Sequence, residues 1–120
     1  MNEAHQSAII SLKWSYEGAA LATAGEDGQI KVWSRGGMLR SQLVNSSKPI
    51  YGVCWSPDND SILYASEKNL TILPTLPGNK QIQWKAHDGI VLCCDWNPAN
   101  NLVISGGEDC KYRVWDQYGR

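Results

Sequence analysis

The sequence predicts an all-β fold built from repeats of one unit. The prediction rests on two copies of one motif and on the spacing between them. Gly25-Glu26-Asp27 followed by Val32-Trp33 returns as Gly107-Glu108-Asp109 followed by Val114-Trp115, at an offset of 82 residues. Two further pairs have the same offset: His5 with His87, and Trp14 with Trp96. The agreement indicates that one structural unit occurs twice in the 120 residues.

A third unit lies between the two clear ones. Trp55-Ser56 follows Trp14-Ser15 at an offset of 41, which is half of the longer spacing. The repeat period is therefore 41 residues, and the chain holds three units of which the middle one has diverged.

The first strand of each clear unit is predicted from an alternating run that ends in Trp. Such alternation is typical of a half-buried strand. The apolar positions are Ile10, Leu12 and Trp14 in the first unit and Leu92, Cys94 and Trp96 in the last.

Two more strands follow in each clear unit after polar turns. A short apolar run, residues 20–23 or 102–105, leads into the Gly-Glu-Asp turn, and residues 29–33 or 111–115 come after it. Turn residues between apolar runs predict strands joined in a meander.

A fourth strand is expected at residues 38–44 and again at residues 80–84. The last unit stops at Arg120, before a fourth strand could form. The predicted division is residues 1–44, residues 45–84 and an incomplete unit at residues 85–120.

The middle unit keeps the strand pattern but has lost the polar markers. Ser46 stands where the other units have His, Lys68 where they have the turn Asp, and Leu73-Pro74 where they have Trp. Because proline cannot donate to a strand ladder, Pro74 should end its strand.

A period of about 40–45 residues with a His near the start and a Trp at the end resembles the WD40 repeat family. The resemblance implies a fragment of a WD40 β-propeller with about three blades, the middle one degenerate and the last without its outer strand. Propellers close at roughly four to eight blades. We therefore expect uncovered faces at both ends, marginal stability and self-association.

Two sets of four residues contain the residue types of a catalytic triad. They are His5, Thr23, Asp27 and Trp33, and His87, Ser105, Asp109 and Trp115. The family resemblance implies that the Asp bonds the His, the His bonds the hydroxyl, and the hydroxyl bonds the indole N–H. Because an active site is normally built once, the duplication favours two structural tetrads and no catalytic residues.

Other chemistry has little support in the sequence. There are two His residues and no Cys-x-x-Cys pair for a metal, and neither GxGxxG nor a P-loop for a nucleotide. We expect no metal, no cofactor, no small-molecule substrate and no enzyme activity.

Charge and hydropathy also narrow the range of partners. Lys and Arg number 11 against 12 Asp and Glu, and no basic run could follow a phosphate backbone, so nucleic acid is not expected as a partner. The longest apolar run, residues 90–94, is far short of a membrane span, so no membrane insertion is expected. Residues 1–5 do not resemble a secretory signal, which predicts a cytoplasmic location.

The cysteines and tryptophans are expected to be structural. Cys93 and Cys94 are neighbours in an extended run and should point to opposite faces, so the four cysteines are expected to be buried free thiols. Five of the six tryptophans recur at two repeat positions, and Trp84 stands where the repeat expects an apolar residue. All six are therefore expected in the core.

Five stretches resemble, more narrowly, the first propeller of an intraflagellar transport subunit: residues 14–18, 25–33, 37–41, 83–90 and 107–112. That resemblance implies a protein-interaction scaffold whose partners are other subunits of intraflagellar transport complex B, at the cilium and basal body. Two alternatives stay open. One is another WD40 adaptor, such as a ubiquitin-ligase substrate receptor, and the other is an enzyme on a propeller, which would need a polar cluster that is not duplicated.

Overall fold

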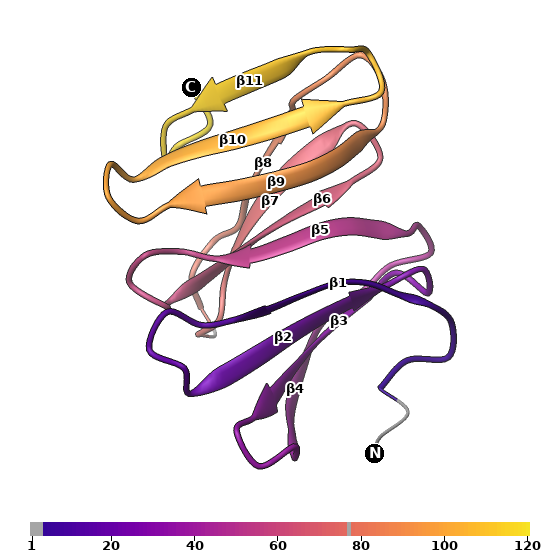
Figure 1. Cartoon of the computed structure of the whole chain (residues 1–120), viewed down its shortest axis with the longest axis vertical. Helices are drawn as coiled ribbons and strands as arrows, with labels where there is room; N and C mark the ends of the chain where they lie inside the picture. Colours follow the sequence, from indigo (N-terminus) through magenta and orange to yellow (C-terminus); the bar gives the residue numbers. More distant parts are fainter. Residues whose placement is uncertain (1–3, 77) are drawn as a thin grey trace.

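All regular structure in the described part of the chain is β-structure (Figure 1). The computed structural model describes residues 4–76 and 78–120. Within these ranges the strands form three antiparallel sheets of four, four and three strands. The predicted fold class, a partial propeller of three blades whose last blade has three strands, is confirmed.

The first sheet follows the chain in simple order. Its strands are β1 (Ile9–Trp14), β2 (Ala20–Gly25), β3 (Gln29–Ser34) and β4 (Leu39–Asn45). Each strand pairs antiparallel with the next, as the alternating runs and polar turns predict.

The other two sheets repeat this meander. The second sheet consists of β5 (Ile50–Trp55), β6 (Ser61–Ser66), β7 (Asn69–Pro74) and β8 (Ile82–Lys85). The third consists of β9 (Val91–Asn97), β10 (Leu102–Gly107) and β11 (Tyr112–Trp115). Strands β4 and β8 each end one residue beyond the predicted unit limits, which stay a prediction.

A β-bulge near the start of each first strand changes the phase of the alternation. The register shifts between Ile9 and Ser11 in β1, and at the corresponding place in the other two sheets. An extra residue in one strand moves the residues before it to the other face. Ile9, and not Ile10 as predicted, therefore lies with Leu12 and Trp14 around one hollow.

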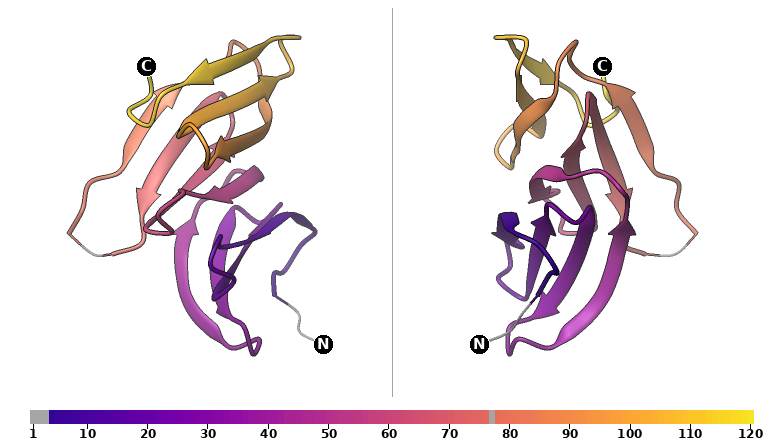
Figure 2. Two further views of the ribbon diagram at one scale, coloured as in Figure 1. Left: turned by 60° about the vertical axis from the view of Figure 1, so that its left-hand side comes forward. Right: turned by 90° about the vertical axis from the view of Figure 1, so that its right-hand side faces the viewer.

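The three sheets contact one another through their first strands. Strands β1, β5 and β9 lie side by side through the middle of the molecule (Figures 1 and 2). Between the first two sheets, Ala22, Ala24 and Ile30 share a core with the larger apolar residues of the second sheet. Those residues are Ile50, Val53, Trp55, Ile62 and Tyr64.

The second and third sheets enclose another core. Leu63 and Leu70 of the second sheet are fully buried there, as are Val91 and Val103 of the third. Because burying a large aliphatic side chain contributes about 1.5–3 kcal/mol, these two layers hold the sheets together.

Three expectations about buried residues were wrong. Trp14 is 51% exposed although Trp55 and Trp96, at the same repeat position, are each 4% exposed. Trp14 faces outward because, within residues 4–76 and 78–120, neither of the other two sheets covers its side of the first sheet. Cys93 and Cys110 are exposed, while Cys54 is buried and Cys94 is half-buried; all four are free thiols.

Candidate functional site

The first tetrad, His5, Thr23, Asp27 and Trp33, is a continuous hydrogen-bonded chain. The indole Nε1 of Trp33 donates to Thr23 Oγ1 at 2.9 Å, and His5 Nε2 lies 2.7 Å from the same oxygen. The other ring nitrogen, Nδ1, lies 3.1 Å from both carboxylate oxygens of Asp27. Strand β2, strand β3 and the turn between them supply three members, and His5 precedes β1.

The second tetrad, His87, Ser105, Asp109 and Trp115, has the same geometry in the third sheet. Trp115 Nε1 donates to Ser105 Oγ at 3.0 Å, and His87 Nε2 lies 2.8 Å from that oxygen. His87 Nδ1 lies 3.0 and 3.1 Å from the two oxygens of Asp109.

One proton arrangement satisfies every group in each tetrad. The indole donates to the hydroxyl oxygen, the hydroxyl donates to Nε2, and Nδ1–H of the imidazole donates to the carboxylate. Both histidine side chains have no exposed surface, so each proton position is fixed by a protein partner. A buried polar chain in which every member is satisfied makes a structure rigid.

Backbone amides complete the surroundings of the two carboxylates. Asp27 accepts from the amides of Gln29 at 3.1 Å and Gln6 at 3.2 Å. Desolvation acts to raise the pKa of Asp27, but the hydrogen bonds from the Gln29 amide, His5 and the Gln6 amide together lower that pKa below its ordinary value. The pKa of Asp109 is lowered against the same desolvation by the equivalent bonds.

Glycine is required where the turn begins in both tetrads. A Cβ on Gly107 would stand 2.8 Å from both the Asp109 carboxylate and His87 Nδ1. On Gly25 it would stand 2.8 Å from the carboxylate of Asp27. In the recurring Gly-Glu-Asp sequence, the Asp side chain thus accepts the hydrogen bonds, and the Gly leaves the space that a Cβ would otherwise fill.

The tetrads contain the residue types of a hydrolytic triad, but their hydroxyl groups are buried and already hydrogen-bonded. Thr23 and Ser105 are 4% and 2% exposed, and each hydroxyl oxygen already accepts from an indole. A nucleophilic hydroxyl must instead be open to a substrate carbonyl. The buried thiol of Cys54 is also a poor nucleophile, because its hydrogen bond with Cys94 and its burial raise its pKa well above 9.0.

The middle sheet has an apolar replacement for the tetrad. Tyr64 stands at the Thr23 position at the offset of 41, and Leu73 pairs with Ile62 as Trp33 pairs with Leu21. Tyr64 lies within the first core and Leu73 packs against it. Lys68, at the turn position of Asp27, contributes its backbone carbonyl, which accepts from the amide of Ala86.

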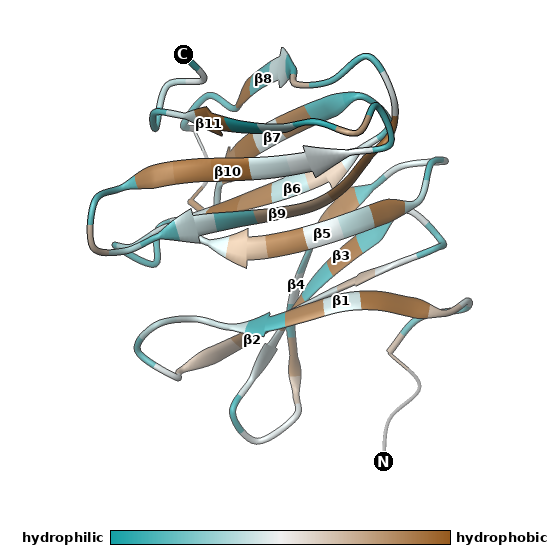
Figure 3. Cartoon of the chain, turned by 45° about the horizontal axis from the view of Figure 1, so that its top comes forward, coloured by the Kyte–Doolittle hydropathy of each residue, from teal (hydrophilic) through white to brown (hydrophobic). Residues whose placement is uncertain are grey.

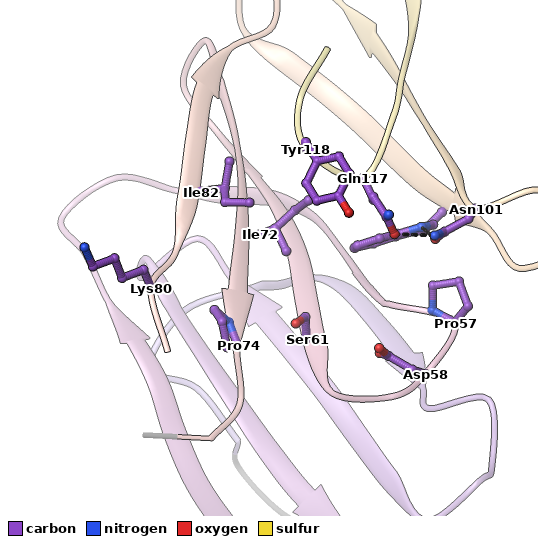
Figure 4. A pocket seen from close by; sticks show the side chains of 11 residues that line it. Pro57, Asp58, Ser61, Ile72, Pro74, Lys80, Ile82, Asn101, Gln117 and Tyr118 are labelled. Carbon is purple, nitrogen blue, oxygen red and sulfur yellow. Dashed lines mark hydrogen bonds between the residues drawn. The ribbon is translucent and has the colours of Figure 1, made fainter. Parts of the chain in front are cut away.

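A groove of about 310 Å³ lies between the second and third sheets (Figure 4). Figure 4 shows Lys80 on one side and Asp58 on the other, with Pro74 between them and Ile82 and Tyr118 above. The remaining lining residues are Pro57, Ser61, Ile72, Trp96, Asn101 and Gln117. The side-chain bond from Ser56 and the amide of Asp60 lower the pKa of Asp58 below its ordinary value, so the groove has a carboxylate on the Asp58 side.

Metal and membrane features can be checked over the same described residues. In residues 4–76 and 78–120, no group of three or more His, Cys, Asp or Glu side chains is arranged to hold a metal ion. No helix in that part of the chain is long and apolar enough to cross a membrane.

Comparison with known families adds a direct match to the repeat. The profile described as "WD domain, G-beta repeat" matches residues 2–34 and 78–116, which include both tetrads. The chain belongs to the WD40 repeat family. The unmatched residues 35–77 include β5, β6 and β7, where the WD40 polar markers have been replaced.

Individual WD40 relatives differ widely in similarity. The intraflagellar transport protein 80 homologs of Mus musculus and Rattus norvegicus are each 56% identical over 98% of this chain. The F-box-like/WD repeat-containing protein TBL1X of Mus musculus is 32% identical over 81% of the chain. The chain spans 15% of the length of the first two relatives and 18% of the third.

The repeat spacing predicted which residues come together in the tetrads, and their structural role stays a prediction; the groove was not predicted. Its lining comes from five separate segments, around Pro57, Pro74, Lys80, Asn101 and Tyr118. No motif links these five segments to one another, so only the packing of the second WD40 sheet on the third brings them together.

Proposed function

We propose that this chain is a non-enzymatic protein-interaction scaffold whose two tetrads are structural and whose surface groove binds a protein partner. Satisfied tetrads in the first and third sheets support this role, because a rigid framework presents its loops with little ordering cost on binding. The groove offers apolar side chains between Lys80 and Asp58, which suits a peptide segment with both apolar and charged groups.

The partners we propose are other subunits of an intraflagellar transport assembly, and the location is the cilium and basal body. The observation that carries this proposal is the 56% identity to the intraflagellar transport protein 80 homologs over 98% of the chain. The likeness to the F-box-like/WD repeat protein is weaker, at 32%, and leaves a ubiquitin-ligase adaptor as the alternative.

Affinity capture of the tagged chain from ciliated mouse cells, followed by mass spectrometry, tests the proposal. The unchanged chain should capture intraflagellar transport subunits above an unrelated WD40 control. Lys80→Glu, which reverses the charge in the groove, should reduce that capture several-fold. Arg40→Glu is the matched control, because it makes the same change at an exposed position of β4 outside the groove.

The two parts of the proposal can fail separately. Capture without intraflagellar transport subunits would overturn the assignment, and enrichment of ubiquitin-ligase subunits would favour the alternative. Equal capture by Lys80→Glu and the unchanged chain would show that partners bind elsewhere.

A further inference from the structure

Two of the four cysteines meet between the second and third sheets. Cys54 lies on β5 and is 2% exposed, and Cys94 lies on β9 and is half-buried. Cys54 belongs to the core that these two sheets share, and Cys94 packs against that core. The two side chains are hydrogen-bonded to each other, and both thiols are free. The fold therefore holds two sulfur atoms from neighbouring blades together without a covalent bond.

The strands that carry the two cysteines lie side by side, and each has a hydrophobic stretch (Figure 3). Gly52, also on β5, makes room for Cys94. A Cβ on Gly52 would stand 3.1 Å from Cys94 Sγ and 3.4 Å from the backbone nitrogen of Cys94. Because Gly52 has no side chain, the backbone of β9 and the Cys94 thiol can approach β5 closely.

The neighbouring interface shows that the fold does not require this pair. At the offset of 41, Cys54 and Cys94 correspond to Lys13 and Val53, which lie on β1 and β5. Those two strands are also in contact, and the indole Nε1 of Trp55 donates to the carbonyl of Lys13 at 3.0 Å. A lysine and a valine thus serve at the equivalent positions, so the thiol pair is a feature of one interface and not of the repeat.

We propose that Cys54 and Cys94 form a modification site, at which a peroxide oxidises the two thiols to a disulfide that links the second sheet to the third. A disulfide requires two side chains that already face each other, and this contact supplies them. A dithiol reductant can restore the thiols by exchange, so the link is reversible. When formed, it holds in one arrangement the two sheets that make the groove.

The reaction with hydrogen peroxide has two balanced steps. The hydrogen bond with Cys94 and burial raise the pKa of Cys54, so the more accessible Cys94 reacts first. The Cys94 sulfur attacks one peroxide oxygen, the O–O bond breaks, and a sulfenic acid and water are formed. The Cys54 sulfur, held beside it, then attacks the Cys94 sulfur. The S–O bond breaks, and the departing hydroxide takes the Cys54 proton to form a second water.

The test is mass spectrometry of the purified, folded chain after treatment with hydrogen peroxide, with the remaining thiols alkylated under denaturing conditions. No protein partner takes part, so the outcome is independent of the proposed function. A disulfide should join Cys54 to the peptide that contains Cys94, and dithiothreitol should release it. The link should persist in Cys93→Ser and Cys110→Ser, which remove exposed thiols, and should be lost in Cys94→Ser.

Cys94→Val is a second variant in case Cys94→Ser does not fold, because Val53 holds the corresponding place and is 1% exposed. Oxidation should raise the melting temperature of Cys93→Ser by several degrees, since the link restricts the unfolded chain, and should not raise that of Cys94→Val. Cys54 that stays unlinked in the treated chain, a link from Cys54 to Cys93, or a link that survives Cys94→Val would each overturn the proposal. An oxidised Cys93→Ser chain that melts below its reduced form would also contradict it.

Discussion

Thr23 and Ser105 stand at the centre of the two tetrads, because each hydroxyl is hydrogen-bonded to both the indole and the imidazole. The hydroxyl accepts from the indole and donates to the imidazole, so its removal leaves two buried polar groups without their partner. A buried group that loses its hydrogen bond costs more than the bond itself contributes.

Ser105→Ala should lower the free energy of unfolding by about 1–3 kcal/mol, the cost of leaving buried polar groups unsatisfied. Denaturant unfolding followed by fluorescence measures this change. Ser41→Ala, at an exposed position of β4, should change the free energy by less than about 0.5 kcal/mol. Equal stability of Ser105→Ala and the unchanged chain would show that the tetrad contributes nothing to the fold.

The two tetrad carboxylates should make the stability of the fold depend on pH in the acidic range. The pKa values of Asp27 and Asp109 are lowered from the ordinary 3.8, so the unfolded chain binds protons at a higher pH than the folded chain does. Their stabilisation is therefore complete above about pH 3.8 and is lost as the pH falls through the lower folded values.

Asp27→Asn should have a smaller loss of stability between about pH 6 and pH 3 than the unchanged chain, because one carboxylate no longer titrates. Thermal melting at both pH values measures the difference. Part of the loss should remain, since the pKa values of Asp58 and Asp109 are also lowered. An identical acid dependence in the variant would contradict a lowered pKa for Asp27.

At the level of elements, the turn between the second and third strands of each clear repeat fixes the tetrad. Gly107 lets the chain pass directly beside His87 and Asp109, while the Asp accepts from the amide of Lys111 inside the same turn. The middle sheet lacks both the Gly and the Asp at this place, and it relies on apolar residues such as Leu63 and Leu70, which are fully buried.

Gly107→Ala should destabilise the chain by about 1–3 kcal/mol, because the new methyl group would stand 2.8 Å from the Asp109 carboxylate and from His87. Gly36→Ala is the matched control, since the nearest atom to its new Cβ would be 3.9 Å away. Melting temperatures of the two variants compare them directly. If the two variants had the same melting temperature, the close contacts of Gly107 would not explain why the turn needs a glycine.

The extent of sequence-based prediction also differs between elements. Alternation and turn residues predicted the strands, because both report local backbone preferences. The bulge in β1 escaped prediction, since Ile9 and Ile10 are equally apolar and only pairing with β2 decides which one joins Trp14.

For the whole molecule, the repeat position of a residue predicted its type, but it did not predict whether the residue is buried. Trp14, Trp55 and Trp96 share a position, yet only the latter two are covered by another sheet. Cys93 is exposed for a similar reason, because it corresponds at the offset of 82 to Ser11, whose hydroxyl accepts from the amide of Val53 in the next sheet. Burial at the ends of a repeat array depends on whether a neighbouring unit covers the residue. The repeat period in the sequence does not show this.

The groove between the second and third sheets is also a feature of the whole molecule, because two sheets form it together. Lys80 and Asn101 come close to it only after two sheets have packed, and no local pattern marks either residue. A groove of this kind is a property of the assembled blades, whereas the tetrads are a property of single repeats.

Hydrogen exchange of the indole protons of Trp33 and Trp115, followed by NMR, tests most directly whether the tetrads are closed structural units. Both protons should be protected in the unchanged chain, because each donates to a buried hydroxyl. In folded Ser105→Ala, the Trp115 proton should exchange faster while that of Trp33 keeps its protection, and Thr23→Val should give the reverse. Rapid exchange of both protons in the unchanged chain, or no response of Trp115 to Ser105→Ala, would contradict the structural role of the tetrads.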